Sequence, residues 1–194
     1  MKALVERIRA EGQNLGSGIL KIDSILNHQL DPRLMMQMGE EMARLFAGIH
    51  VDRILTAEIS GIAPALTTGY VLNVPVVYAR KLKPITMAGP VFLETAPSHT
   101  KGGEVNLLVS AEFLHAGENV LIIDDFLASG KTLLALARMV KSAKATVVGV
   151  GVVVEKTFEG GRDLMIKAGY GGVPIHALAT IIGMDDGTIT LKDD

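Results

Sequence analysis

The apolar residues of this chain follow two spacings, one typical of helices and one typical of buried strands. Between residues 2 and 14 they recur at the spacing of a single helix face, which predicts a short amphipathic helix. A second helix is predicted to begin at Asp31-Pro32, because aspartate is a favoured N-cap and proline is favoured at the first helical position. The apolar positions of both helices are expected to face the core: Leu4, Val5 and Ile8 in the first, and Leu34, Met35, Met38, Met42, Leu45 and Phe46 in the second.

From residue 53 onward, short runs of Val, Ile, Leu and Ala alternate with segments of helical spacing. The predicted strands are 53–57, 74–79, 105–110, 120–123, 146–154 and 175–181, and the predicted helices are 62–72, 131–144 and 162–169. This alternation is typical of an α/β protein with a mostly parallel sheet flanked by helices. Gly149 and Gly151 lie inside one predicted strand, with no helix directly after them, so we expect them to allow close packing and not to bind a dinucleotide.

One long interval, residues 82–104, interrupts the alternation. It is rich in proline and glycine, and so long a structureless run in a compact domain is usually a functional lid or disorder. We therefore predict a mobile lid over an active site. Its candidate polar residues are Glu94, Ser98, Thr100 and Lys101.

Composition limits the class of protein. A chain of 194 residues with 48% apolar residues predicts a single domain, 1–194, and a formal charge of −2 argues against a general nucleic-acid binder. The absence of cysteine excludes disulfides and thiolate chemistry, and no apolar run reaches the roughly 20 residues of a membrane span. The histidines lack metal-ligand spacing and there is no G-x-S-x-G serine, so a hydrolase has no support. We expect a cytoplasmic protein without signal peptide or membrane anchor.

The segment 120–132 carries the chemistry. An apolar strand ends in Asp124 and Asp125, and a small-residue loop then leads into a helix whose free N–H groups and hydroxyls can hold a phosphate. Two carboxylates beside an anion site require something neutral or cationic, which a phosphorylated ribose with Mg2+ supplies. The alternative is that they cap the helix or end the strand in solvent. A P-loop is excluded because Asp125 occupies the position of its first glycine.

Two other strand ends offer phosphate ligands. The backbone amides of Ser60 and Gly61 could hold a diphosphate, or Ser60 could be an ordinary helix N-cap. Arg80 and Lys81 are either counter-charges for a diphosphate or a solvated strand end.

Residues 120–132 resemble the phosphoribosyl pyrophosphate (PRPP) motif of the type I phosphoribosyltransferases. The resemblance implies that Asp124 and Asp125 are the catalytic pair facing the ribose hydroxyls. It assigns the 5-phosphate to Ala128, Ser129, Gly130, Lys131 and Thr132, and the diphosphate to Ser60, Gly61, Arg80 and Lys81. Mg2+ would enter as the partner of PRPP, without a separate protein site.

The whole chain is most similar to the bacterial family members that use xanthine in purine salvage. Residues 19–32 resemble the segment that covers the base, and residues 154–158 resemble a strand end that contacts it. The resemblance implies a type I fold with a small hood built from residues 1–32 and C-terminal elements, a homodimer, and transfer of phosphoribose to N9 of xanthine. It places Leu20, Asn27 and Lys156 against the base, where donors would face the two xanthine oxygens.

The sequence leaves several alternatives open. Taken singly, Asn27 fits a loop turn and Lys156 a surface lysine. Another base, such as guanine, hypoxanthine, adenine or orotate, would use the same phosphate residues. A regulator that senses PRPP and binds nucleic acid would need a basic face, which the near-balanced charge does not favour.

Overall fold

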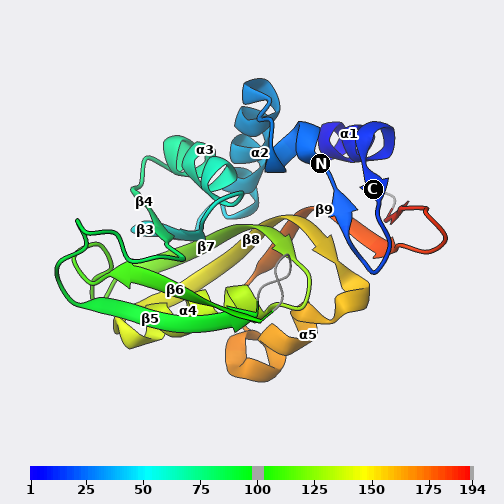
Figure 1. Cartoon of the computed structure of the whole chain (residues 1–194). Coiled ribbons are helices and arrows are strands. Elements are labelled where there is room, and N and C mark those ends of the chain that lie inside the picture. Colours follow the sequence, from blue (N-terminus) through cyan, green and yellow to red (C-terminus); the bar gives the residue numbers. More distant parts are fainter. Residues whose placement is uncertain (98–102, 193–194) are drawn as a thin grey trace.

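A six-stranded sheet forms the centre of the computed structural model, which describes residues 1–97 and 103–192 (Figure 1). Its strand order is β10-β9-β8-β7-β3-β4. The five long strands run parallel and only β10 is antiparallel, which confirms the mostly parallel sheet. The bounds are β3 (Arg53–Ala57), β4 (Val76–Ala79), β7 (Asn119–Leu127), β8 (Thr146–Lys156), β9 (Ile175–Gly183) and β10 (Thr190–Leu191).

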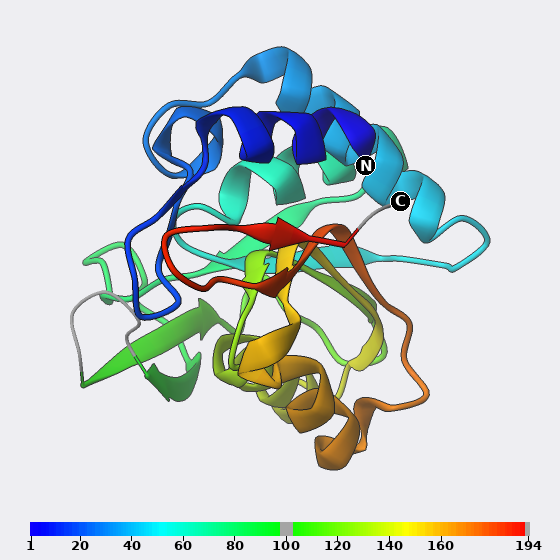
Figure 2. The ribbon, with the colours of Figure 1, turned by 90° about the vertical axis from the view of Figure 1, so that its right-hand side faces the viewer.

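Helices cover both faces of this sheet, so the molecule has three layers (Figures 1 and 2). One face carries α1 (Lys2–Glu11), α2 (Pro32–Leu45) and α3 (Ile62–Leu72), and the other carries α4 (Lys131–Ser142) and α5 (Gly161–Met165). Short elements connect these layers: β1 (Gln13–Asn14), β2 (Leu20–Lys21), η1 (Asp23–Asn27), η2 (Thr157–Glu159) and η3 (Ile166–Tyr170). Asp31 caps α2 by accepting the backbone N–H groups of Arg33 and Leu34, as the sequence predicted.

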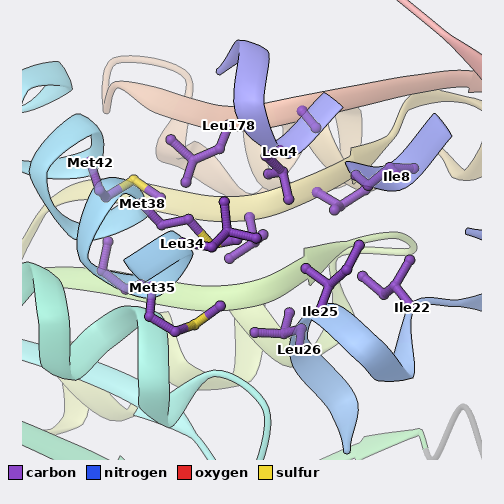
Figure 3. Packing of buried hydrophobic residues seen from close by; sticks show 14 of the residues in the cluster. Leu4, Ile8, Ile22, Ile25, Leu26, Leu34, Met35, Met38, Met42 and Leu178 are labelled. Carbon is purple, nitrogen blue, oxygen red and sulfur yellow. The ribbon is translucent and has the colours of Figure 1, made fainter. Parts of the chain in front are cut away.

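The core beneath α1 and α2 explains the two glycines of β8. Side chains from α1, η1, α2 and β9 point toward one another there (Figure 3). A Cβ on Gly149 would lie 2.5 Å from Cε1 of Phe46, and one on Gly151 would lie 2.4 Å from Sδ of Met42. Close packing of α2 on the sheet therefore requires both glycines, which confirms the expected role.

The prediction that residues 82–104 lack regular structure is wrong for residues 91–97. These residues form β5 (Val91–Pro97), which pairs antiparallel with β6 (Glu104–Ser110). The error has a clear origin, because Phe92, Glu94 and Ala96 alternate with exposed Leu93 and Thr95 at the spacing of a strand. Ser98, Thr100 and Lys101 lie outside the described residues.

Other predicted boundaries also change: the helix predicted over 2–14 ends at Glu11, because residues 13 and 14 form β1, and the strand predicted over 74–79 begins at Val76. The strand predicted over 120–123 runs to Leu127, because pairing with β8 continues through the acidic pair. The strand predicted to end at 154 runs to Lys156. The helix predicted over 162–169 is the short α5 followed by η3, since Gly169 has a φ of 99° and interrupts the helical backbone.

An ion pair at the amino-terminal end of the sheet ties β3 to β7. Arg53 bonds Glu118 twice, at 2.9 and 2.5 Å, and both side chains are about 15% exposed. The Arg53 guanidinium, helped by the His115 N–H groups, lowers the pKa of Glu118 to about 2. The folded state therefore favours the ionised carboxylate.

We expect Glu118→Gln to lower the free energy of unfolding by about 3 kcal/mol at neutral pH. Because the pKa of Glu118 is depressed on folding, its contribution is complete above its ordinary pKa of 4.5 and is lost as the pH falls toward about 2. Urea unfolding measured across that range checks this. The matched control is Glu112→Gln, at an exposed carboxylate in the same turn. A penalty that does not change with pH would contradict the assignment to the ion pair.

Candidate active site

A cavity of about 740 Å3 opens at the carboxyl ends of β3, β7 and β8. In an open α/β sheet this edge is where ligands bind, since loops and helix N-termini meet there. The sequence predicted chemistry at three strand ends, and residues from all three line this one cavity.

The loop before α4, residues 128–132, carries the residues that the sequence predicted to bind a phosphate, so it is named the phosphate loop. Ala128, Ser129, Gly130 and Thr132 line the cavity, whereas Lys131 is exposed and contributes its backbone to the first turn of α4. Gly130 caps the helix with a φ of 76°, a conformation that favours glycine. The N–H groups of the first turn have no partner within the helix and, together with the helix dipole, favour an anion.

Gly161, which the sequence analysis did not select, lies directly behind this loop. A Cβ at Gly161 would lie 2.2 Å from the Ala128 carbonyl oxygen and 2.6 Å from the Gly130 nitrogen. Any larger residue would push the loop out of position. Consecutive glycines just after a strand end were the available signal, but spacing alone could not show what they contact.

Asp124 and Asp125 lie within β7, at the floor of the cavity. Burial raises the pKa of Asp124 well above its ordinary value, and the adjacent charge of Asp125 raises it further. Burial also raises the pKa of Asp125, while the Phe126 N–H and the Ser60 hydroxyl oppose that shift by stabilising the charged form. The alternative of a helix cap or a solvated strand end is wrong, because Gly130 caps α4 and Asp124 is only 4% exposed.

The turn between β3 and α3 forms the opposite wall. Ser60 and Gly61 line the cavity, and a Cβ on Gly61 would lie 2.3 Å from Oγ1 of Thr56 and 2.4 Å from Oδ1 of Asp124. Only glycine allows the turn to approach the acidic pair so closely. Ser60 is not the N-cap of α3, because Gly61 occupies that position and no side chain caps the helix.

The structure places Arg80 and Lys81 differently. Lys81 lines the cavity and helps to stabilise the charged form of the acidic pair. Arg80 points to Glu58, with Nε 3.7 Å from Oε2, and is not among the residues that line the cavity. Glu58 also accepts the Lys81 backbone N–H at 2.7 Å, so it fixes the position of this strand end.

The N-terminal segment and the end of β8 form the remaining wall. Leu20, Asn27 and Lys156 come from β2, η1 and β8 and line the same cavity, where Leu20 is buried and Asn27 is exposed. The side chain of Lys156 is only 10% exposed, so the alternative of a surface lysine is wrong. Phe126 and Glu159, which no sequence motif singled out, also line this wall. An apolar residue two positions after Asp124 on the same strand face was the signal for Phe126.

Glu94, one of the candidate residues of the predicted lid, contacts α4 and does not line the cavity. Its Oε2 accepts a hydrogen bond of 2.7 Å from Nε of Arg138 in α4, so it fixes the β5–β6 hairpin to that helix. Glu94 is not among the cavity residues.

Comparison with known proteins agrees with this geometry. The family model described as a phosphoribosyl transferase domain matches residues 22–168, which include the acidic pair, the phosphate loop and Lys156. The chain belongs to the phosphoribosyltransferase family. This phosphoribosyltransferase is 53% identical over 187 residues to the xanthine phosphoribosyltransferase of Deinococcus deserti, covering 96% of this chain and 95% of the relative. It is 47% identical to the xanthine phosphoribosyltransferase of Lactobacillus acidophilus over the full length of both chains.

Solved structures of family members share its fold. The adenine phosphoribosyltransferase of Thermoanaerobacter pseudethanolicus superposes on this phosphoribosyltransferase with a TM-score of 0.74 at 25% identity, covering 91% of this chain and 99% of that one. The enzyme of the same name from Trypanosoma brucei, solved with AMP, pyrophosphate and ribose-5-phosphate, gives a TM-score of 0.75 at 22% identity, covering 91% and 79%. These likenesses confirm the type I fold.

Within residues 1–97 and 103–192, no three His, Asp or Glu side chains gather closely enough to hold a metal ion. In the same ranges, no helix has the length and apolar character needed to cross a bilayer.

Proposed function

We propose that this phosphoribosyltransferase transfers the phosphoribosyl group of PRPP to N9 of xanthine, giving xanthosine 5′-monophosphate and pyrophosphate. The observation that carries the proposal is that one cavity unites the phosphate loop, the buried acidic pair and the Lys156 wall. The names of the relatives at 47 to 53% identity support xanthine as the base.

The reaction breaks the bond from C1′ to the diphosphate, which leaves with the bonding electrons, and forms a bond from C1′ to N9, with inversion at C1′ and release of the imidazole N–H proton of xanthine to solvent. The N-terminal amides of α4 and the Ser129 and Thr132 hydroxyls would hold the 5-phosphate. The carboxylates of Asp124 and Asp125 would face the ribose hydroxyls and stabilise the positive charge that grows on the ring. The amides of the Ser60–Gly61 turn and the Lys81 ammonium would receive the departing diphosphate.

The donor set fits a magnesium ion that arrives with PRPP. Mg2+ is commonly bound by one or two carboxylates together with phosphate oxygens and water, and Asp124 and Asp125 supply two adjacent carboxylates in the cavity. Bound there, the ion would neutralise diphosphate charge. The acidic pair would hold it, with the oxygens of PRPP completing the set.

The base would lie against Leu20 and Phe126, with Lys156 and Asn27 as donors. Xanthine presents oxygens at C2 and C6, and each needs a donor in a site that excludes water. Guanine places an amine at C2, which would set donor against donor, and hypoxanthine would leave one donor unpaired. Selection for xanthine follows from that mismatch.

We expect pyrophosphate release to depend on xanthine, and Asn27→Ala to reduce discrimination among the 6-oxopurines by about tenfold. The measurement is the initial rate with PRPP and Mg2+, with xanthine, guanine, hypoxanthine, adenine and orotate offered separately. Activity confined to another base would keep the phosphate site and discard the base assignment. PRPP binding without release for any base would favour the sensing regulator, for which the formal charge of −2 offers no general nucleic-acid surface.

The homodimer is part of the same proposal, with the apolar surface of α3 and β4 as its interface. Leu66, Tyr70 and Val71 of α3 and Tyr78 of β4 are all exposed, with Tyr70 76% exposed. Exposed large apolar side chains that cluster on the surface of a soluble protein mark an interaction site.

We also place the reaction in the cytoplasm, because PRPP is a highly charged sugar phosphate that does not cross a bilayer.

We expect Tyr70→Glu to convert the dimer into a monomer, because it would bury a carboxylate in an apolar interface. Sedimentation velocity over a range of concentrations measures this. Phe113→Glu is the control, since Phe113 is an exposed aromatic residue that belongs to neither α3 nor β4. A wild-type protein that is monomeric at all concentrations, or a Tyr70→Glu protein that still dimerises, would contradict the interface.

A further inference from the structure

The Lys156 side chain is held on three sides at the end of β8. Its Nζ donates to the Gly18 carbonyl oxygen at 2.6 Å and to Oε1 of Glu159 at 3.3 Å. The same atom lies 5.3 Å from the centre of the Phe126 ring. An ammonium group has three N–H donors, and within the described residues no other acceptor bonds this one. One donor therefore remains for a ligand in the cavity.

Glu159 is placed by the chain itself to make this contact. It ends η2, the single turn that directly follows Lys156, so its side chain folds back onto the lysine three residues earlier. It lines the cavity and is about one quarter exposed. A Cβ on Gly18 would lie 3.6 Å from Oε1 of Glu159, so the carboxylate lies beside the N-terminal loop.

The contact matters because a lysine is long and flexible. Four rotatable bonds let the ammonium leave any one position unless its partners fix it. Phe126 fixes one side by a cation–π contact, and the Gly18 carbonyl fixes another. Among the described residues, Glu159 provides the only side-chain oxygen that accepts a hydrogen bond from this ammonium, and a nearly buried N–H donor needs an acceptor to stay in place.

We propose that Glu159 is a positioning residue for the purine: by accepting one N–H of Lys156, it keeps another N–H directed at an oxygen of the base. This inference rests on the proposed function, and it adds a determinant of base affinity that need not touch the base. Because Glu159 acts only through Lys156, it should influence base binding and leave the phosphate site unchanged.

The test compares Glu159→Met with Glu159→Gln in the full-length protein. Methionine has similar length but accepts hydrogen bonds only weakly, whereas the glutamine amide oxygen accepts them well. We expect Glu159→Met to raise KM for xanthine about tenfold, with kcat and KM for PRPP within about twofold of the wild type. Glu159→Gln should restore KM for xanthine to within about threefold of the wild type.

Controls separate this inference from the proposed function. Asp163→Ala removes an exposed carboxylate from the neighbouring helix and should leave all three constants unchanged. Thermal unfolding of each variant shows whether the fold is retained. An unchanged KM for xanthine in Glu159→Met, an equal rise in KM for PRPP, or a failure of Glu159→Gln to restore the constant would overturn the inference. If the wild type releases no pyrophosphate with any base, the proposed function itself fails.

Discussion

Asp124→Asn is expected to lower kcat by about 100-fold or more and to leave the fold at least as stable as the wild type. The loss follows because an amide cannot supply the negative charge that faces the developing positive charge on the ribose. The folding stability is retained or increased because Asp124 is buried beside Asp125, and burial raises its pKa well above the ordinary value. Ionising this side chain therefore costs the empty folded state free energy at neutral pH.

The pH dependence makes this prediction specific. A raised pKa on folding means that the wild type loses stability as the pH rises above the ordinary value of 3.8, since the unfolded chain then ionises first. The stability advantage of Asp124→Asn should accordingly be small near about pH 4 and larger at about pH 8. Asp163→Asn, at an exposed position, should change neither activity nor this profile. An active Asp124→Asn enzyme would remove Asp124 from the mechanism.

Gly161→Ala is expected to lower kcat/KM for PRPP by about 100-fold, although residue 161 contributes no functional group. The added Cβ would lie 2.2 Å from the Ala128 carbonyl and 2.6 Å from the Gly130 nitrogen, distances that backbone atoms can relieve only by moving. The phosphate loop would shift away from its anion-binding geometry. Initial rates with PRPP varied at saturating xanthine measure the effect, and KM for xanthine should change little.

The matched control is Gly172→Ala, because no atom lies within 4 Å of a Cβ at that position and its φ is ordinary. It should behave as the wild type. A Gly161→Ala enzyme with normal PRPP kinetics would show that the loop tolerates displacement, and would reduce Gly161 to a packing residue.

Local sequence signals predicted the helices and strands correctly where the hydrophobic periodicity and the capping residues agreed. Asp31-Pro32 fixed the start of α2, and the apolar runs at 53–57 and 146–154 fixed two central strands. The β5–β6 hairpin was missed because proline and glycine at both ends of the interval concealed a two-residue alternation. Strand ends were also misjudged, since β7 and β8 continue by pairing with each other past the point where their residues stop being apolar.

In the candidate site, too, some features follow from local spacing in the sequence and others depend on tertiary packing. Motif spacing predicted the acidic pair and the 128–132 loop, because adjacent residues on one strand end and one helix N-terminus must lie together. The contacts of Gly161 and the bond from Glu159 to Lys156 could not be predicted, because each depends on where a separate turn packs. Arg80 and Lys81 show what local spacing cannot predict. The two residues are adjacent in the sequence, but Lys81 lines the cavity and Arg80 lies against Glu58.

By itself, the sequence determined the α/β class, the adjacency of the acidic pair and the 128–132 loop at the end of β7, and the membership of residues 22–168 in the phosphoribosyltransferase family. These depend on period, capping and local spacing, which are properties of consecutive residues. Only the tertiary structure decided that Asp124 is buried, that Lys156 is held by Gly18 across 138 positions of chain, and that Gly161 supports the phosphate loop. Burial and long-range contact arise from how the layers pack, and the free energies that set pKa values and loop positions are determined there.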